Sequence, residues 1–200
     1  MAKYTKIPTS TFETIQINAG VLLSSFDPTS ASVTDENILG ATTGGINFTA
    51  TPSFQDYGED IDNCPKNTKE LKRLTDWEVK CSGTFVTISA ALAARLAAAA
   101  DVASTKVTPR RDLAAADFKD LWLVGDYSDV NTDGGTGSAQ KAGFIAIKML
   151  NTLSTGGFQL KTSDKAKGQF AFEFTAHFSM DAQDTVPFEI YVVAGTPAST

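Results

Sequence analysis

The residues best suited to bind a metal ion lie between positions 129 and 140. The run Asp129-Val-Asn-Thr-Asp-Gly134 places oxygen-bearing side chains at alternate positions before a glycine, as in the first half of a calcium-binding loop. The twelfth position, where such a loop carries a bidentate glutamate, is Gln140. Because the flanking segments read as strands, and Asp, Asn and Gly are common turn residues, the pattern favours a flexible hairpin loop. We therefore predict no metal site.

His177 is the only histidine and the residue most suited to acid–base catalysis. Glu173, Thr175 and Ser179 share its predicted strand face, so the spacing alone permits a triad-like group. No nucleophile beside an oriented base can be named, and polar residues on a strand face are usually only solvated. We predict that the protein is not an enzyme.

The cysteines and glycines do not form a cofactor motif. Cys64 and Cys81 lack CxxC spacing and a nearby histidine, which argues against zinc, and Cys81 fits a small buried hydrophobe. The glycines of 40–45 and 134–137 lack the Gly-Lys-Ser/Thr of a phosphate-binding loop. We predict no bound cofactor.

Composition limits the function classes. The chain has 200 residues and a net charge of −6, which argues against tight nucleic-acid binding. The N-terminus lacks the apolar segment of a signal peptide. The most apolar run, 90–100, is too short to span a bilayer and carries Arg95. We expect one domain over 1–200, no membrane partner, and synthesis in the cytoplasm with reduced thiols.

The clearest structural signal is the alternation between positions 168 and 179. Its apolar side holds Phe170, Phe172, Phe174, Ala176 and Phe178, and its polar side holds Gln169, Glu173, Thr175, His177 and Ser179. This period of two predicts a strand with one buried and one wet face. Residues 180–185 then turn the chain, and 186–193 are expected to return it as a second strand that shares the Phe-rich face.

Similar patterns predict the remaining elements. In the segment 77–88, Trp77, Val79, Cys81 and Phe85 share one face, and Gly83 indicates a bulge or a close backbone approach. A helix is expected over 89–100, with Ser89 as N-cap. Further strands are predicted at 12–18, 46–51, 118–127 and 143–153, with a Gly-rich loop at 127–142. The result is a mainly β fold of two packed antiparallel sheets with one flanking helix.

A long insertion is predicted between strands at 52–75. Its first half is acidic, its second half is basic, and apolar residues are scattered through both. The acidic residues are Asp56, Glu59, Asp60 and Asp62, the basic residues are Lys66, Lys69, Lys72 and Arg73, and the apolar residues include Phe54, Tyr57, Ile61, Leu71 and Leu74. Loops of this length are uncommon in compact domains unless they are functional or disordered. Opposite charge blocks suit contact with another copy of the chain, whereas the alternative is a solvated surface excursion.

The order of these segments resembles the tail tube (major tail) proteins of tailed bacteriophages, particularly long-tailed phages of Gram-positive hosts. The resemblance covers nearly the whole chain and depends on the order of its segments, because no single motif is specific. The segments are Phe12 to Phe26, Gly40-Ala-Thr-Thr-Gly-Gly45, Tyr57 to Asn63, the Trp77–Ile88 strand with its Ala/Leu helix, and Val186 to Val193.

The resemblance implies a structural virion protein. Two nearly orthogonal sheets with a flanking helix would form hexameric rings whose inner strands make a continuous β-barrel. The rings would stack head to tail into the tail tube, through which DNA passes without specific binding. Implied partners are other copies, the tape measure protein, the tail terminator and the distal tail protein. The implied location is the virion tail.

Residue-level reasoning agrees with such a conduit. Strands with one polar face suit a wet lumen, and an acidic wall would not hold a polyanion. Candidates to face the lumen are Gln169, Glu173 and Thr175, and the opposite strand face stays open because a one-residue slip in register reverses every side chain. We expect the 52–75 insertion to bridge rings. Two alternatives stay open: the tube of a contractile tail or secretion machine, and a virion-surface or carbohydrate-binding β-sandwich.

Overall fold

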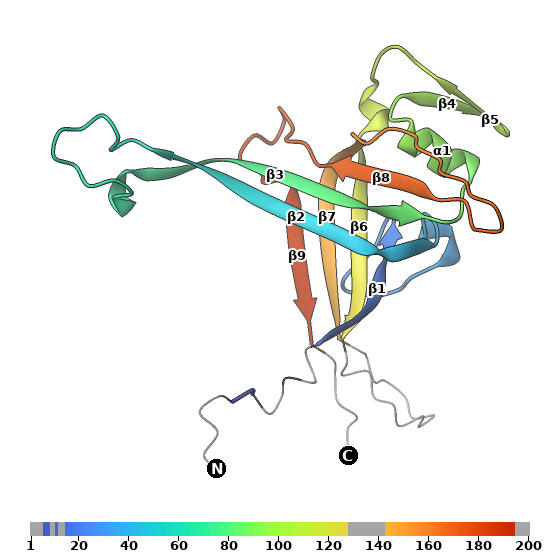
Figure 1. Ribbon diagram of the computed structural model, residues 1–200, viewed down its shortest axis with the longest axis horizontal. Coiled ribbons are helices and arrows are strands. Elements are labelled where there is room, and N and C mark those ends of the chain that lie inside the picture. The colour runs from blue at the N-terminus through green and yellow to red at the C-terminus, as the bar shows by residue number, and fades with distance from the viewer. Residues whose placement is uncertain (1–5, 9–10, 12–14, 128–142, 195–200) are drawn as a thin grey trace.

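The computed structural model describes residues 6–8, 11, 15–127 and 143–194. Within these residues the protein is mainly β, with two antiparallel sheets and one α-helix, as the sequence predicts. A long hairpin projects from one end of the molecule (Figure 1). None of the helices in the described residues is long and apolar enough to cross a membrane.

Sheet A contains four strands in the order β1-β6-β7-β9. They are β1 (Gln16–Leu23), β6 (Lys119–Tyr127), β7 (Phe144–Ser154) and β9 (Phe188–Val193). Every pair is antiparallel, and the β1–β6 register shifts between Ile17 and Val21. The second sheet lies across sheet A (Figure 1).

Sheet B contains β8, β3 and β2, in that order. They are β8 (Phe170–Thr175), β3 (Lys72–Phe85) and β2 (Thr42–Asp56). Long β7 joins the two sheets, because its last residues, Leu153 and Ser154, pair with β8. The sheets cross face to face and do not close into a barrel within the described part of the chain (Figure 1).

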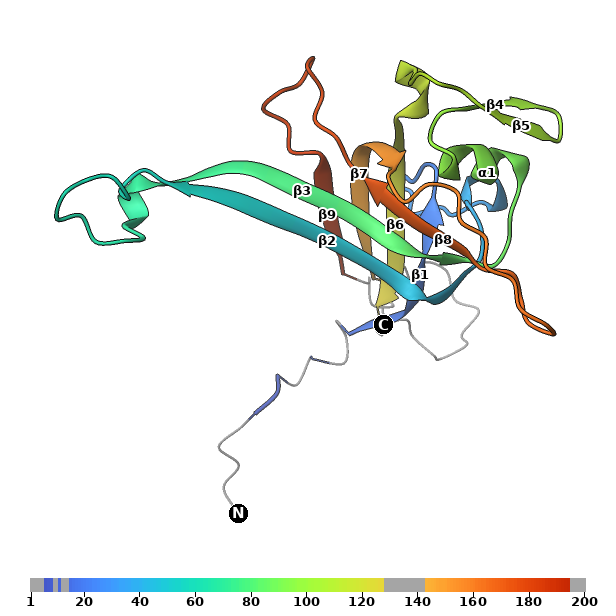
Figure 2. The same cartoon turned by 45° about the horizontal axis from the view of Figure 1, so that its top comes forward.

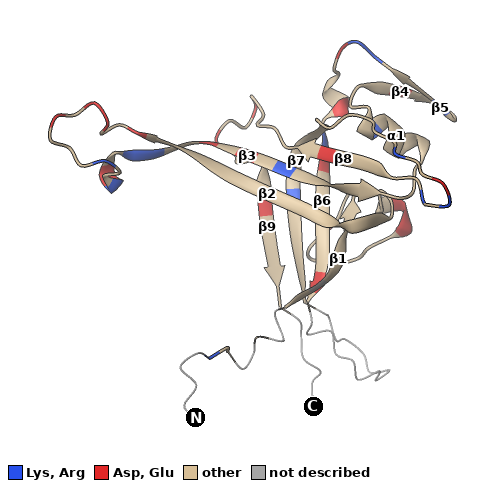
Figure 3. Cartoon of the chain, viewed as in Figure 1, with Lys and Arg blue, Asp and Glu red and all other residues tan. Residues whose placement is uncertain are grey.

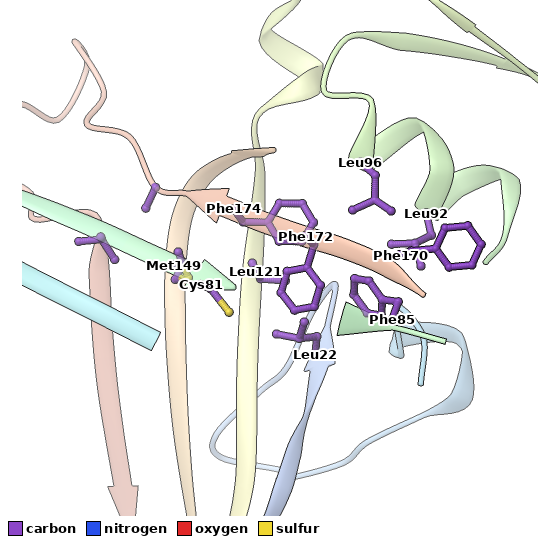
Figure 4. Packing of buried hydrophobic residues seen from close by; sticks show 12 residues of the cluster. Leu22, Cys81, Phe85, Leu92, Leu96, Leu121, Met149, Phe170, Phe172 and Phe174 are labelled. Carbon is purple, nitrogen blue, oxygen red and sulfur yellow. The ribbon is translucent and has the colours of Figure 1, made fainter. Parts of the chain in front are cut away.

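The main core lies between the sheets and the helix. Burial alternates strictly along β8, so that Phe170, Phe172 and Phe174 point inward. The apolar face predicted on β3 is also confirmed, because Val79, Cys81 and Phe85 are fully buried. Figure 4 shows these rings beside the leucines of the helix. Each large apolar side chain buried here contributes about 1.5–3 kcal/mol of transfer free energy.

Gly83 marks a close approach, one of the two roles predicted for it. A Cβ atom at this position would lie 2.8 Å from Cζ of Phe172 and 3.1 Å from the carbonyl oxygen of Gly45. The irregularity in the ladder lies opposite, between Thr43 and Ile46 of β2. Any side chain at position 83 would therefore displace the phenylalanine that fills the core.

A second apolar cluster covers the other face of sheet A. Phe26, from the segment after β1, packs edge-to-face on Trp122 at 5.6 Å and on Phe144 at 5.4 Å between ring centroids. Leu23, Val124 and Ala146 complete the cluster. Both faces of this sheet are therefore partly covered, which the sequence patterns do not predict.

The helix is shorter than predicted. α1 spans Ala90–Leu96, and Ser89 caps it as expected, because the N–H of Leu92 donates to Ser89 Oγ at 3.1 Å. The prediction that it continues to residue 100 is wrong. Ala98 adopts a left-handed φ of 65°, and the chain then forms a hairpin of β4 (Ala100–Ala103) and β5 (Lys106–Pro109). Pairing between these strands outweighs the helix propensity of alanine.

Arg95 attaches α1 to the sheets. Its Nη2 donates to the carbonyl oxygen of Asp120 at 2.8 Å and to Thr152 Oγ1 at 3.2 Å. Its guanidinium carbon lies 5.4 Å from the ring centroid of Phe174. Burial lowers the pKa of Arg95 to about 10, so it stays protonated at neutral pH. The charge within the Ala-rich run is thus a structural anchor.

The predicted hairpin between the last two strands is wrong. β8 pairs with β3 and with the end of β7, whereas β9 pairs with β7 alone among the described strands. The two strands also contact different parts of the core, since Phe188 of β9 packs on Trp77 at 5.3 Å between ring centroids. Segment 176–187 therefore carries the chain from one sheet to the other.

Candidate functional site

The outward side of sheet B is almost entirely polar. Residues directly opposite one another in its ladders lie on the same face. Two carboxylates and one ammonium lie on β3, a carboxylate and a hydroxyl on β8, and four uncharged polar residues on β2. We call this surface the polar face, and its residues are Asn47, Thr49, Thr51, Ser53, Asp76, Glu78, Lys80, Ser82, Glu173 and Thr175.

Hydrogen bonds order the centre of the polar face. Thr155 Oγ1 donates to Glu173 Oε1 at 3.0 Å and lies 2.8 Å from Thr175 Oγ1. Lys80 forms an ion pair with Glu78. This contact, with a smaller contribution from Glu173, raises the pKa of Lys80 above its ordinary value of 10.5. The face as a whole carries three carboxylates and one ammonium, so its balance is acidic.

The three residues predicted to face a lumen do not all lie together. Glu173 and Thr175 are neighbours on the polar face. Gln169 precedes β8, is exposed, and pairs through its backbone with Lys161, with both N–H···O distances at 2.9 Å. The structure therefore groups two of the three residues. The polar-face residues of β2 and β3, and Thr155, are not among those predicted to face a lumen, although alternation in Ile46 to Thr51 and in Trp77 to Phe85 indicates which side chains share a face.

The predicted insertion begins and ends as a two-stranded ribbon, with a tip of turns at 57–71. β2 runs to Asp56 and β3 begins at Lys72, so the ends of the 52–75 segment are strand residues. The cross-strand pairs Phe54–Leu74, Gln55–Arg73 and Asp56–Lys72 continue the ladder into solvent. Figure 2 shows this ribbon projecting well beyond the body of the protein. Phe54 and Leu74 share one face and remain 56% and 50% exposed, and Gln55 and Arg73 on the other face are exposed as well, so neither face of the ribbon is covered.

The tip of the ribbon is held by local hydrogen bonds. Asp56 accepts the N–H groups of Gly58 at 2.9 Å and Asn67 at 2.8 Å. These bonds, in that order, and the nearby Lys72 lower the pKa of Asp56 below its ordinary value of 3.8. Lys72 Nζ also donates to Asn67 Oδ1 at 3.2 Å. The tip is therefore a defined structure rather than an irregular excursion.

A small cluster fills the inside of the tip. Gly58 is buried, and a Cβ there would lie 3.0 Å from Cys64 Sγ and 3.1 Å from Leu71 Cδ1. Leu71 ends the short 3-10 helix η3 (Lys69–Leu71) and accepts the N–H of Tyr57 at 3.1 Å. The tip thus has a small packed interior of its own.

The charges of the tip are segregated as the sequence indicates. The acidic residues Glu59, Asp60 and Asp62 occupy the outer turn, and all three are exposed. The basic residues lie on the return path, at Lys66, Lys69, Lys72 and Arg73. Figure 3 shows the two groups as separate red and blue stretches. Within this return path, Lys69 pairs with the neighbouring Glu70 at 3.5 Å.

The residues considered for chemistry have structural surroundings. His177 Nδ1 donates to the carbonyl oxygen of Asn151 at 3.1 Å, and its ring packs on Phe118. Burial raises the pKa of the Cys81 thiol to about 12. Among the described residues, no three His, Cys, Asp or Glu side chains gather as metal ligands would. The possible calcium loop, from Asp129 to Gln140, lies outside the described residues, as does most of the Gly-rich loop at 127–142.

Two strands of the main sheets have a free edge. In the part of the chain that the structure describes, β2 pairs only with β3 and β9 only with β7, whereas the outer edge of β1 is partly occupied, because Leu23 bridges Ile38 and Leu22 accepts the N–H of Leu39 at 3.0 Å. Unpaired backbone groups on such edges can hydrogen-bond to another chain. A comparison with protein-family models finds no match, and neither does a comparison with curated proteins.

Proposed function

We propose that the protein is a structural subunit that assembles into hexameric rings, and that these rings stack into the tail tube of a bacteriophage. The ribbon formed by the outer parts of β2 and β3 carries this proposal. Ordering such a ribbon costs conformational entropy, and it buries little apolar surface within its own chain. A second copy that covers it would supply the missing burial.

The free strand edges support the ring. Pairing between sheets of neighbouring subunits would satisfy their open edges and join six copies into a continuous barrel. A closed ring would also stop uncontrolled growth in the plane of the sheets. Stacking of rings would then use the ribbon, whose length allows it to reach beyond its own subunit (Figure 2).

The polar face supports the role of a conduit. It is wet, lacks an exposed apolar patch, and has an acidic balance around Glu173 and Lys80. A wall of this kind would repel DNA weakly along the whole path instead of binding phosphates. The tape measure protein, tail terminator and distal tail protein would be its partners in the virion tail, and the subunit would be made in the host cytoplasm.

Assembly of the purified protein tests the proposal. Native mass spectrometry over rising concentration should reveal hexamers or their multiples, and negative-stain microscopy should show rings or tubes with a central hole. A protein that remains monomeric in both measurements, also after addition of a distal tail complex as initiator, would contradict the function.

Charge reversal on the polar face tests the conduit. Glu173→Lys raises the net charge by two units per subunit, and Glu173→Gln raises it by one. Both variants should assemble, and phage carrying them should eject DNA more slowly, in that order of severity, with recovery in added salt. Asp181→Lys makes the same charge change outside the polar face and serves as control. Normal ejection by the Glu173→Lys phage would exclude a lumen position for this residue.

A further inference from the structure

We infer that the acidic tip of the ribbon in one copy docks on the basic loop before β8 in a second copy. This basic loop comprises residues 156–169. The inference deepens the proposed assembly and depends on it, because it names the surface that receives the ribbon. Three observations support it. The two surfaces carry opposite charge, both expose apolar side chains, and they lie at opposite ends of the molecule.

The donor surface is the outer turn of the ribbon. Tyr57 and Ile61 are 55% and 51% exposed, and three carboxylates, Glu59, Asp60 and Asp62, surround them. An exposed aromatic and an aliphatic side chain with a charged rim match the usual composition of a small protein interface. The hydrogen bonds of Asp56 hold this turn in shape before any contact forms, which lowers the entropy cost of binding.

The basic loop has the complementary composition. Phe158 and Leu160 are 48% and 52% exposed, and Lys161, Lys165 and Lys167 beside them are all exposed. Asp164 is the only acidic residue of this segment. The basic loop therefore has two exposed apolar side chains and a net positive rim, and the ribbon tip has two exposed apolar side chains and a negative rim.

The basic loop is also ordered. Lys161 and Gln169 exchange two backbone hydrogen bonds at 2.9 Å, and Gln159 Nε2 donates to the carbonyl oxygen of Gly156 at 2.8 Å. The ring of Phe158 packs on Phe170 of the core at 6.0 Å between centroids. The loop is thus continuous with the body, so a force on it would pass directly into β8.

The two surfaces lie at opposite ends of the long axis of the molecule (Figure 1). They cannot meet within one chain, so a contact between them joins separate copies head to tail and can propagate. The same views show the acidic turn at the far end of the ribbon and lysines at the loop before β8 (Figure 3). Contact between two tips, or between two basic loops, would place like charges together at their outermost points and is disfavoured.

Charge reversal of each surface provides the first test. The tip-reversed variant carries Glu59→Lys, Asp60→Lys and Asp62→Lys, and the loop-reversed variant carries Lys161→Glu, Lys165→Glu and Lys167→Glu. Each alone should raise the concentration required for assembly at least about tenfold. An equimolar mixture of the two should assemble, because each tip then meets an oppositely charged loop.

A matched control separates position from net charge. Lys106→Glu, Arg111→Glu and Lys119→Glu change the same number of exposed basic residues away from the loop. This control keeps its own ribbon tip and basic loop, so alone it should assemble at the wild-type concentration. Assembly of both reversed variants at the wild-type concentration, or an equal loss of assembly in the control, would overturn the inference while leaving the proposed tube intact.

A disulfide cross-link provides a second test that does not depend on charge. In a Cys64→Ser background, a chain with both Ile61→Cys and Leu160→Cys should give a covalent ladder when assembled and treated with diamide as oxidant. Ile61→Cys with Leu113→Cys, another exposed leucine, should give none. Cross-linked dimers from Ile61→Cys alone would instead show tip-to-tip pairing and refute the head-to-tail contact. A wild-type protein that never assembles would refute the proposed function itself.

Discussion

The inner and outer parts of β3 belong to one continuous strand, yet different interactions stabilise them. From Trp77 to Phe85, alternate side chains enter the core, and Val79, Cys81 and Phe85 are fully buried. From Lys72 to Asp76, every residue is exposed. Hydrophobic burial therefore stabilises the inner part. Hydrogen bonds between β2 and β3, and those that Asp56 accepts at the ribbon tip, maintain the outer part.

In the proposed tube, this difference would separate folding from assembly. A region that is buried in its own chain cannot meet a partner, and a region that projects contributes little to the stability of the chain that carries it. The ribbon can therefore vary in charge without unfolding the body. Substitutions in the two regions test whether stability depends on the inner part of β3 and assembly on the outer part.

The largest loss of stability is expected from the core. Phe174 is fully buried between the sheets, beside Arg95 and Phe172. Phe174→Ala should lower the free energy of unfolding by about 3–5 kcal/mol through lost transfer energy and a cavity. Phe54→Ala in the ribbon is the control, and in chemical denaturation it should change the free energy of unfolding by no more than about 0.5 kcal/mol. Equal losses in the two variants would show that the ribbon shares the core's stability.

Removing the ribbon tip should affect assembly and not folding. Replacement of residues 56–72 by Asn-Gly joins Gln55 to its cross-strand partner Arg73 with a two-residue hairpin turn. The melting temperature should stay within a few degrees of wild type, because no core residue is removed. Sedimentation and microscopy should then detect no tubes. Tubes of normal length from this variant would contradict a bridging role for the ribbon.

The sequence predicts the parts of this structure whose signals are local. The alternating phenylalanines of Phe170 to Phe174 and the Ser89 cap depend on near neighbours, and the structure has both. The partner of a strand is a long-range property. Adjacent strands in sequence suggest a hairpin, yet β8 and β9 pair separately because β7 is long enough to serve both sheets.

The candidate surfaces follow the same rule. The polar residues of β8 are visible in its alternation, but their grouping with Lys80 and Thr155 requires the pairing of three strands. The charges of the ribbon are evident from composition, whereas the sequence predicts a loop where the outer parts of β2 and β3 lie. Their cross-strand partners, such as Phe54 and Leu74, lie far apart in sequence, and no buried face gives them a recognisable period.

The two cysteines allow the accessibility of the core and of the ribbon tip to be compared in one molecule. Cys81 lies in the buried part of β3, and its pKa of about 12 leaves about one thiol in 10⁴ ionised at pH 8. Cys64 is partly exposed at the ribbon tip. One equivalent of a thiol reagent such as DTNB should react with the native protein, and a second only after unfolding. Cys64→Ser should remove the fast equivalent, and rapid reaction of Cys81 would indicate that the inner part of β3 opens.

The smallest expected effect concerns the carboxylate that organises the tip. The N–H groups of Gly58 and Asn67, together with Lys72, hold the pKa of Asp56 below 3.8 in the folded protein. A lowered folded pKa means that this stabilisation is present at neutral pH and is lost as the pH falls through the folded pKa, below 3.8. Asp56→Asn should therefore speed hydrogen exchange of the peptides spanning residues 57–68 at pH 7, with no detectable change in β8.

Asp60→Asn is the matched control, because it removes a carboxylate from the same turn without touching the two N–H groups that Asp56 accepts. In wild type, protection of the tip corrected for intrinsic exchange should fall as the pH is lowered below 3.8, whereas Asp56→Asn should show little such dependence. The change should stay local, since ribbon and body are stabilised by different interactions. If Asp56→Asn instead destabilised β8 as much as the tip, the ribbon and the core would unfold as one unit, and the proposed separation of assembly from folding would not hold.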